Sequence, residues 1–115
     1  MAEQHLDLPA LREIFGGDPA RVAAHLELFV KYVGPMLASL RAVVDDGDAP
    51  ALRLVAHRIA GSCGMVTAHR MAELALMLEM KGVAGTVEGA GPLVDQLDEA
   101  FEATRAYIGA AAIGG

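Results

Sequence analysis

The stretch DAPALRLVAHRIAGSCGMV, residues 48–66, decides the fold of this chain. Asp48 is well suited to cap the first turn of a helix, and the apolar residues after it recur every three or four positions. We therefore predict a helix over this stretch that buries one face. The helix has an unusual feature, because Gly61 and Gly64 follow His57, and each glycine destabilises a helix by about 1 kcal/mol relative to alanine.

Four other segments have the apolar spacing or the end signals of helices. They span residues 8–15, residues 19–44, residues 69–81 and a final stretch that begins near residue 92. In the longest of them the apolar stripe keeps its phase across Gly34-Pro35, which indicates one kinked helix. Residues 82–91, GVAGTVEGAG, have no apolar period and are predicted to form a glycine-rich loop.

The composition favours helices that pack on helices. The chain has 115 residues, of which 54% are hydrophobic and 21% charged, enough apolar material for one core. It has no Trp, two Tyr and three Phe, so the core must be mainly aliphatic. We predict an all-α domain over residues 1–115, an antiparallel four-helix bundle with a short additional N-terminal helix. Residues 1–6 and 110–115 are expected to fray.

Charge and cysteine content limit the classes of partner. The net charge of −6 disfavours binding to nucleic acids, whose phosphates are also negative. The N-terminus is too polar for a signal peptide, and no apolar run reaches the roughly 18 residues of a membrane span. The single cysteine, Cys63, cannot form a disulfide within the chain. We expect a cytoplasmic protein that is monomeric, because the bundle is complete within one chain.

His57 is predicted to lie on the solvent face of its helix. At about 100° per residue it points away from the apolar face, and four residues fall within about 60° of it. These are Arg53, Ala60, Gly61 and Gly64. Two explanations of the glycines stay open. Either a partner must approach the imidazole closely, where side chains would obstruct it, or the glycines only loosen the end of the helix.

The stretch AHRIAGSCGMVTAHRMAELALMLE, residues 56–79, resembles the signature of histidine-containing phosphotransfer (HPt) domains. That signature has a histidine, a Leu-like residue, a lysine, a glycine and small polar residues, with a small residue pair some ten positions on. The matching residues here are His57, Ile59, Gly61, Ser62, Cys63, Ala68, Leu74, Leu78 and Glu79. Residues 11–33 and 40–57 also resemble the family's helices before the active histidine, so the resemblance covers nearly the whole chain.

This chain departs from the family pattern at two places. The family usually has a lysine three residues after the histidine, near the phosphoryl group, and here that residue is Ala60. Arg53, one turn before the histidine on the same face, is the candidate that would supply positive charge instead. The small residue pair is Thr67-Ala68 rather than Gly-Ala. We expect the loss of the lysine to affect the rate of phosphoryl transfer and the lifetime of the phosphohistidine.

The resemblance implies a phosphocarrier in a two-component phosphorelay. His57 would accept a phosphoryl group and pass it to or from an aspartate of a response-regulator receiver domain, with a hybrid histidine kinase upstream. Glu79 stands where relatives have a polar side chain that hydrogen-bonds the histidine, so we expect it to orient the imidazole. Ala60, Gly61 and Gly64 would form the partner-binding surface.

The sequence has no Gly-rich nucleotide loop and no cluster of carboxylates for Mg²⁺. We therefore expect no ATP site and no cofactor of its own, with Mg²⁺ held by the partner receiver domain. The chain would then be a carrier and not an autonomous enzyme. The alternative is a helical adaptor that docks kinase or receiver domains without being phosphorylated, a reading that the missing lysine encourages. A metal site would need His25, His57 and His69 to converge, and no pair of them has the i, i+4 spacing of helical ligands.

Overall fold

The computed structural model describes residues 6–114, with side chains described as far as residue 110, and this part of the chain forms five helices and no strand. The helices are α1 (Leu8–Ile14), α2 (Pro19–Asp45), α3 (Ala49–Met65), α4 (His69–Val83) and α5 (Ala90–Gly114). The predicted order of one short and four long helices is confirmed. None of these helices is both long and apolar enough to cross a membrane.

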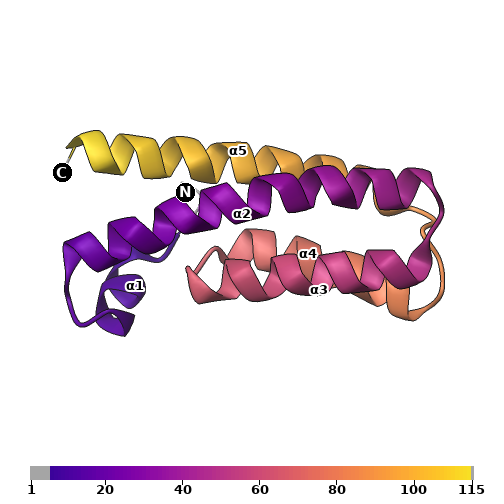
Figure 1. Ribbon diagram of the computed structural model, residues 1–115, viewed down its shortest axis with the longest axis horizontal. Helices are drawn as coiled ribbons and strands as arrows, with labels where there is room; N and C mark the ends of the chain where they lie inside the picture. Colours follow the sequence, from indigo (N-terminus) through magenta and orange to yellow (C-terminus); the bar gives the residue numbers. More distant parts are fainter. Residues whose placement is uncertain (1–5, 115) are drawn as a thin grey trace.

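Local capping explains where the first three helices begin. The carboxylate of Asp7 accepts the N–H of Ala10 at 3.1 Å, and that of Asp48 accepts the N–H of Ala51 at the same distance. Asp18 caps α2 in the same way. Each cap satisfies a backbone donor that has no partner within the helix. The long α2 continues through Pro35 as one helix and changes direction along its length (Figure 1).

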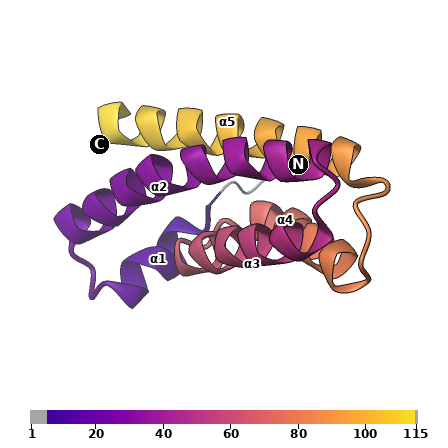
Figure 2. The ribbon, with the colours of Figure 1, turned by 45° about the vertical axis from the view of Figure 1, so that its right-hand side comes forward.

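The four long helices form the predicted antiparallel bundle. Helix α2 packs against α3 and α5, and α4 packs against the same two helices, so each helix has two neighbours around a shared core (Figures 1 and 2). The elongated body measures 43 × 25 × 23 Å. Helix α1 folds back beside the beginning of α2, at one end of the bundle. Near the other end Arg41 of α2 pairs with Asp95 and Asp98 of α5, both at 2.7 Å, and these contacts raise the pKa of the guanidinium.

The core is almost entirely aliphatic, as the composition predicted. Its fully buried large side chains include Leu40, Leu52, Ile59, Met71, Leu74, Leu78, Val94 and Leu97. Cys63 belongs to this core, with no exposed surface, and burial raises the pKa of its thiol to about 12. The single cysteine therefore faces inward.

Two predictions at the ends of elements were wrong. Leu6, expected to fray, is only 2% exposed, because its side chain joins the core where α1 covers the end of the bundle. The loop between the last two helices is shorter than predicted, since Gly82 belongs to α4 and α5 already begins at Ala90. Helix α5 continues to Gly114, where a run of alanines supports helical backbone, and the fraying expected over residues 110–115 stays a prediction. Residues 1–5 and 115, also expected to fray, lie outside the described residues.

Candidate functional site

The centre of the candidate site is a contact between His57 of α3 and Glu79 of α4. Their Nδ1 and Oε2 atoms lie 3.0 Å apart, within the range of a hydrogen bond. The histidine side chain is 72% exposed, whereas the glutamate side chain is only 18% exposed. Because a carboxylate can only accept, Nδ1 carries the proton of this contact and Nε2 is the nitrogen with a free lone pair.

The surface on the C-terminal side of His57 is bare, as the helical spacing predicted. Gly61 and Gly64 are exposed, and a Cβ atom added to either would meet nothing within 4 Å. Ala60 is half-buried and packs against the core, so its methyl group adds little to this surface. Packing within the protein therefore gives no reason for the two glycines.

On this face of α3, the charged residue nearest to His57 is Arg53, which lies one turn earlier in the helix. It is exposed, and its guanidinium makes no hydrogen bond or ion pair with another residue of the described chain. Its guanidinium is thus not held by a carboxylate. The methyl group of Ala60 cannot replace the charge of the family's lysine.

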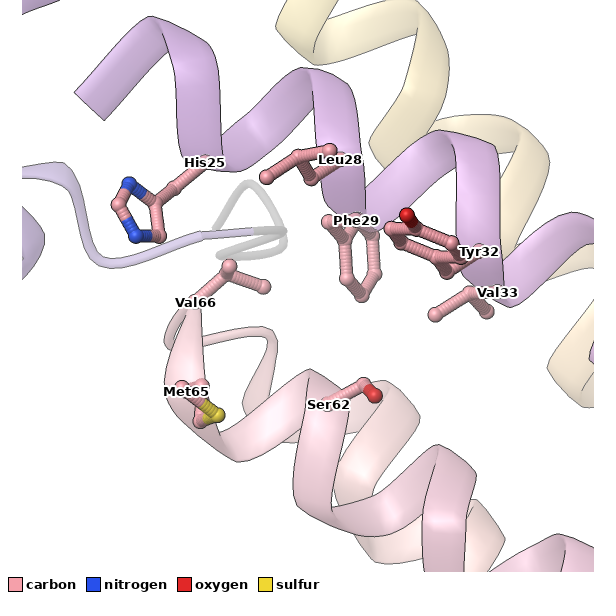
Figure 3. A pocket seen from close by; sticks show the side chains of 8 residues that line it. All are labelled: His25, Leu28, Phe29, Tyr32, Val33, Ser62, Met65 and Val66. Atoms are coloured by element: carbon pink, nitrogen blue, oxygen red, sulfur yellow. The ribbon is translucent and has the colours of Figure 1, made fainter. Parts of the chain in front are cut away.

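An apolar hollow lies beside the C-terminal end of α3 (Figure 3). It has a volume of about 210 Å³, with α2 on one side and the last turns of α3 on the other. Its lining residues are His25, Leu28, Phe29, Tyr32, Val33, Ser62, Met65 and Val66. Three of them are large and exposed, namely Leu28, Tyr32 and Met65. Met65 follows Gly61 by one helical turn and is the next residue after Gly64, so the hollow adjoins the bare strip.

Sequence reasoning missed this hollow, although a signal was present. Leu28 and Tyr32 are large residues four positions apart that lie outside the inward stripe of their helix, a spacing that puts them on one face. Two apolar residues near this end of the bundle, Leu11 and Phe15, pack on the core. Leu11 is completely buried, and the half-buried Phe15 packs on the ring of His25, with centroids 4.1 Å apart.

Among the described residues, His25 and His69 are not gathered at the site. The Nδ1 atom of His25 lies 2.9 Å from the carbonyl oxygen of Arg21, and His69 is exposed at the start of α4. Among residues 6–110 no group of three or more His, Cys, Asp or Glu side chains is arranged to hold a metal ion.

A four-helix bundle that presents one exposed, carboxylate-held histidine beside a bare strip has the architecture of a histidine phosphotransfer domain. Residues 24–107 match the family model of the Hpt domain, and the chain belongs to this family. The crystal structure of histidine-containing phosphotransfer protein B (HptB) from Pseudomonas aeruginosa superposes with a TM-score of 0.87. The two chains are 27% identical, and the match covers 96% of each. No curated protein sequence matches the chain.

Proposed function

We propose that this histidine phosphotransfer protein accepts a phosphoryl group on Nε2 of His57 and exchanges it with an aspartate of a receiver domain. The observation that carries the proposal is the contact of Nδ1 with Glu79, which leaves the opposite nitrogen free on an imidazole that is 72% exposed. A phosphoryl acceptor must present a lone pair to a partner's phosphorus atom, and Nε2 meets this requirement.

The transfer step follows from this arrangement. The Nε2 lone pair attacks the phosphorus of an aspartyl phosphate, the P–N bond forms, and the P–O bond breaks to release the aspartate carboxylate. The ring, still protonated at Nδ1, becomes a cation, and the carboxylate of Glu79 faces that charge at 3.0 Å. The reverse step returns the phosphoryl group to an aspartate and restores the neutral ring. Arg53 would balance the negative charge of the phosphoryl oxygens in place of the family's lysine.

The docking surface for the receiver domain comprises Ala60, Gly61, Gly64 and the adjoining apolar hollow. A strip without side chains lets the partner's backbone approach the imidazole, while Leu28, Tyr32 and Met65 offer apolar area beside it. The Mg²⁺ ion and the groups that activate the aspartate belong to the receiver, and ATP to the upstream kinase. In this proposal the chain is a monomeric carrier in the cytoplasm, without an ATP site of its own.

The test uses two phosphoryl donors with the wild type and His57→Gln. Phosphoramidate, a small donor that needs no partner, should phosphorylate the wild type once and leave the variant unmodified in an intact-mass measurement. Radiolabelled ATP with a hybrid histidine kinase from the same organism should label the wild type only. If the protein binds receivers while neither donor labels it, the proposal is wrong and the chain is the non-phosphorylated adaptor.

A further inference from the structure

Gly82 marks the closest approach of α4 to α3. A Cβ atom built on this glycine would lie 2.6 Å from the backbone nitrogen of Arg53 and 2.7 Å from its Cα and Cβ atoms. Ordinary van der Waals contact begins at 3.4 Å. The atoms in the way are two backbone atoms and the Cβ atom attached to them, none of which can rotate aside as the end of a flexible side chain would. Gly82 is buried in the helix and does not adopt a positive φ, so its backbone conformation does not require glycine. The need for glycine comes from this contact between helices.

The Gly82–Arg53 contact is one turn away from the Glu79–His57 contact. Gly82 follows Glu79 by three residues on α4, and Arg53 precedes His57 by four on α3. Since the two helices are antiparallel neighbours, the two pairs form adjacent levels of the same interface. The separation of the helices at Gly82 therefore sets how far the Glu79 carboxylate must reach.

We propose that Gly82 is a positioning residue of the phosphoacceptor site. Because it has no side chain, α4 lies close enough to α3 for Glu79 to bind Nδ1 of His57. This inference rests on the proposed function, in which that contact orients the imidazole. An alanine at position 82 must push the helices apart locally by about 1 Å to restore ordinary contact. The distance between Nδ1 and Oε2, which is 3.0 Å in the wild type, would then increase beyond the range of a hydrogen bond.

The experiment compares Gly82→Ala with Gly109→Ala in the full chain. Gly109 is also a helical glycine, but a Cβ there meets nothing within 4 Å, so it controls for the change of residue type. The first readout is the ¹⁵N NMR spectrum of the His57 imidazole, which reports whether Nδ1 keeps its proton and its hydrogen bond. The second is the rate of phosphorylation by phosphoramidate.

We expect Gly82→Ala to lose the Nδ1 signature and to be phosphorylated about tenfold more slowly, the effect of losing one hydrogen bond to a charged group. Gly109→Ala should match the wild type in both readouts. Glu79→Ala should slow the reaction similarly, and adding Gly82→Ala to Glu79→Ala should cause little further loss, because both changes remove the same contact.

The outcomes separate this inference from the function on which it rests. If Glu79→Ala slows phosphorylation while Gly82→Ala keeps the wild-type rate and spectrum, the role of Gly82 is refuted and that of Glu79 stands. If Glu79→Ala has no effect, the orienting role itself is wrong. Should Gly82→Ala fail to fold, Glu79→Asp tests the same requirement, because it withdraws the carboxylate by one methylene at unchanged helix spacing. A wild-type rate in Glu79→Asp would then overturn the inference.

Discussion

Glu79 and His57 lie 22 residues apart in the chain and on different helices, yet Oε2 of one and Nδ1 of the other are only 3.0 Å apart. The contact joins a well-shielded carboxylate to a largely exposed imidazole. It fixes the orientation of a ring that would otherwise rotate freely in solvent, and it distinguishes the two ring nitrogens. This asymmetry leads directly to a prediction about the chemical product.

The phosphorylated protein should carry its phosphoryl group on Nε2 of His57. Nδ1 is engaged by Glu79, so only Nε2 has a lone pair directed to solvent. Protein labelled with ¹⁵N in its histidines and treated with phosphoramidate can be assigned by ¹⁵N and ³¹P NMR. Glu79→Ala should slow the reaction by about tenfold without altering the helical circular dichroism. A wild-type product with phosphorus on Nδ1 would contradict the assignment.

Sequence reasoning succeeded where the determinants are local. The aspartate caps at positions 7, 18 and 48 each act within their own turn, so the helix starts were predictable. The solvent-facing position of His57 follows from helical spacing alone. Its contact with Glu79 was suggested only by the family resemblance, since it depends on how α3 and α4 pack.

The missed features depend on the distance between helices. Gly82 was assigned to a loop because it opens a glycine-rich stretch without an apolar period, although it continues the inward spacing of Ala75 and Leu78. Burial of Leu6 likewise depends on where α1 folds back against the end of the bundle. No local pattern determines such contacts between distant segments. At both positions the tertiary contacts outweigh the local conformational preference of the residue.

Arg53 should contribute the positive charge that the family's lysine supplies elsewhere. Because the site is open to solvent, we expect Arg53→Ala to slow transfer from a phosphorylated receiver by only about 3- to 5-fold. Introducing Ala60→Lys into that variant should restore the rate. Arg105→Ala is the control, since Arg105 pairs with Glu102 on α5. Single-turnover kinetics at low salt provide the measurement, and equal rates for Arg53→Ala and Arg105→Ala would exclude the role of Arg53.

Replacing the glycines of the bare strip should stabilise the protein and impair docking. Gly61→Ala and Gly64→Ala meet open space, so each should raise the free energy of unfolding by about 1 kcal/mol. The added methyl groups should nevertheless raise the KM for a phosphorylated receiver, because they occupy the path of its approach. Urea unfolding and transfer kinetics measure the two effects. Gly109→Ala should gain stability with no change in KM, and the same result for Gly61→Ala and Gly64→Ala would mean that the strip does not contact the partner.

Cys63 should be unreactive in the folded protein. Burial raises the pKa of its thiol to about 12, from 9.0 for an unhindered cysteine, so almost no thiolate exists at pH 8. Labelling with a thiol reagent should be slow in buffer and rapid in urea. The unfolded chain loses this proton near pH 9 and the folded one only near pH 12, so the thiol should lower stability as pH rises through that interval. Rapid labelling without denaturant would show that the end of α3 opens readily.

Thr67 should hold the N-terminal segment against the end of α3. It has a φ of 62°, the only positive value among the non-glycine residues described, at a position that ends a helix and favours glycine. Its buried hydroxyl accepts the N–H of Asp7 at 2.9 Å and lies 3.2 Å from the carbonyl oxygen of the same residue. The hydrogen bond that the hydroxyl accepts helps to offset a backbone strain of about 1–3 kcal/mol.

Two variants separate the strain at this position from the hydrogen bonds. Thr67→Val keeps the strained, branched side chain but loses the hydroxyl, so it should destabilise the protein by about 1–3 kcal/mol. Thr67→Gly removes both, and its net stability should change less. In both variants, amide hydrogen exchange should accelerate over residues 6–15, since the segment has lost its attachment. If exchange there matches the wild type in Thr67→Val, burial of Leu6 and Leu11 is sufficient to hold the segment, and the hydroxyl is dispensable.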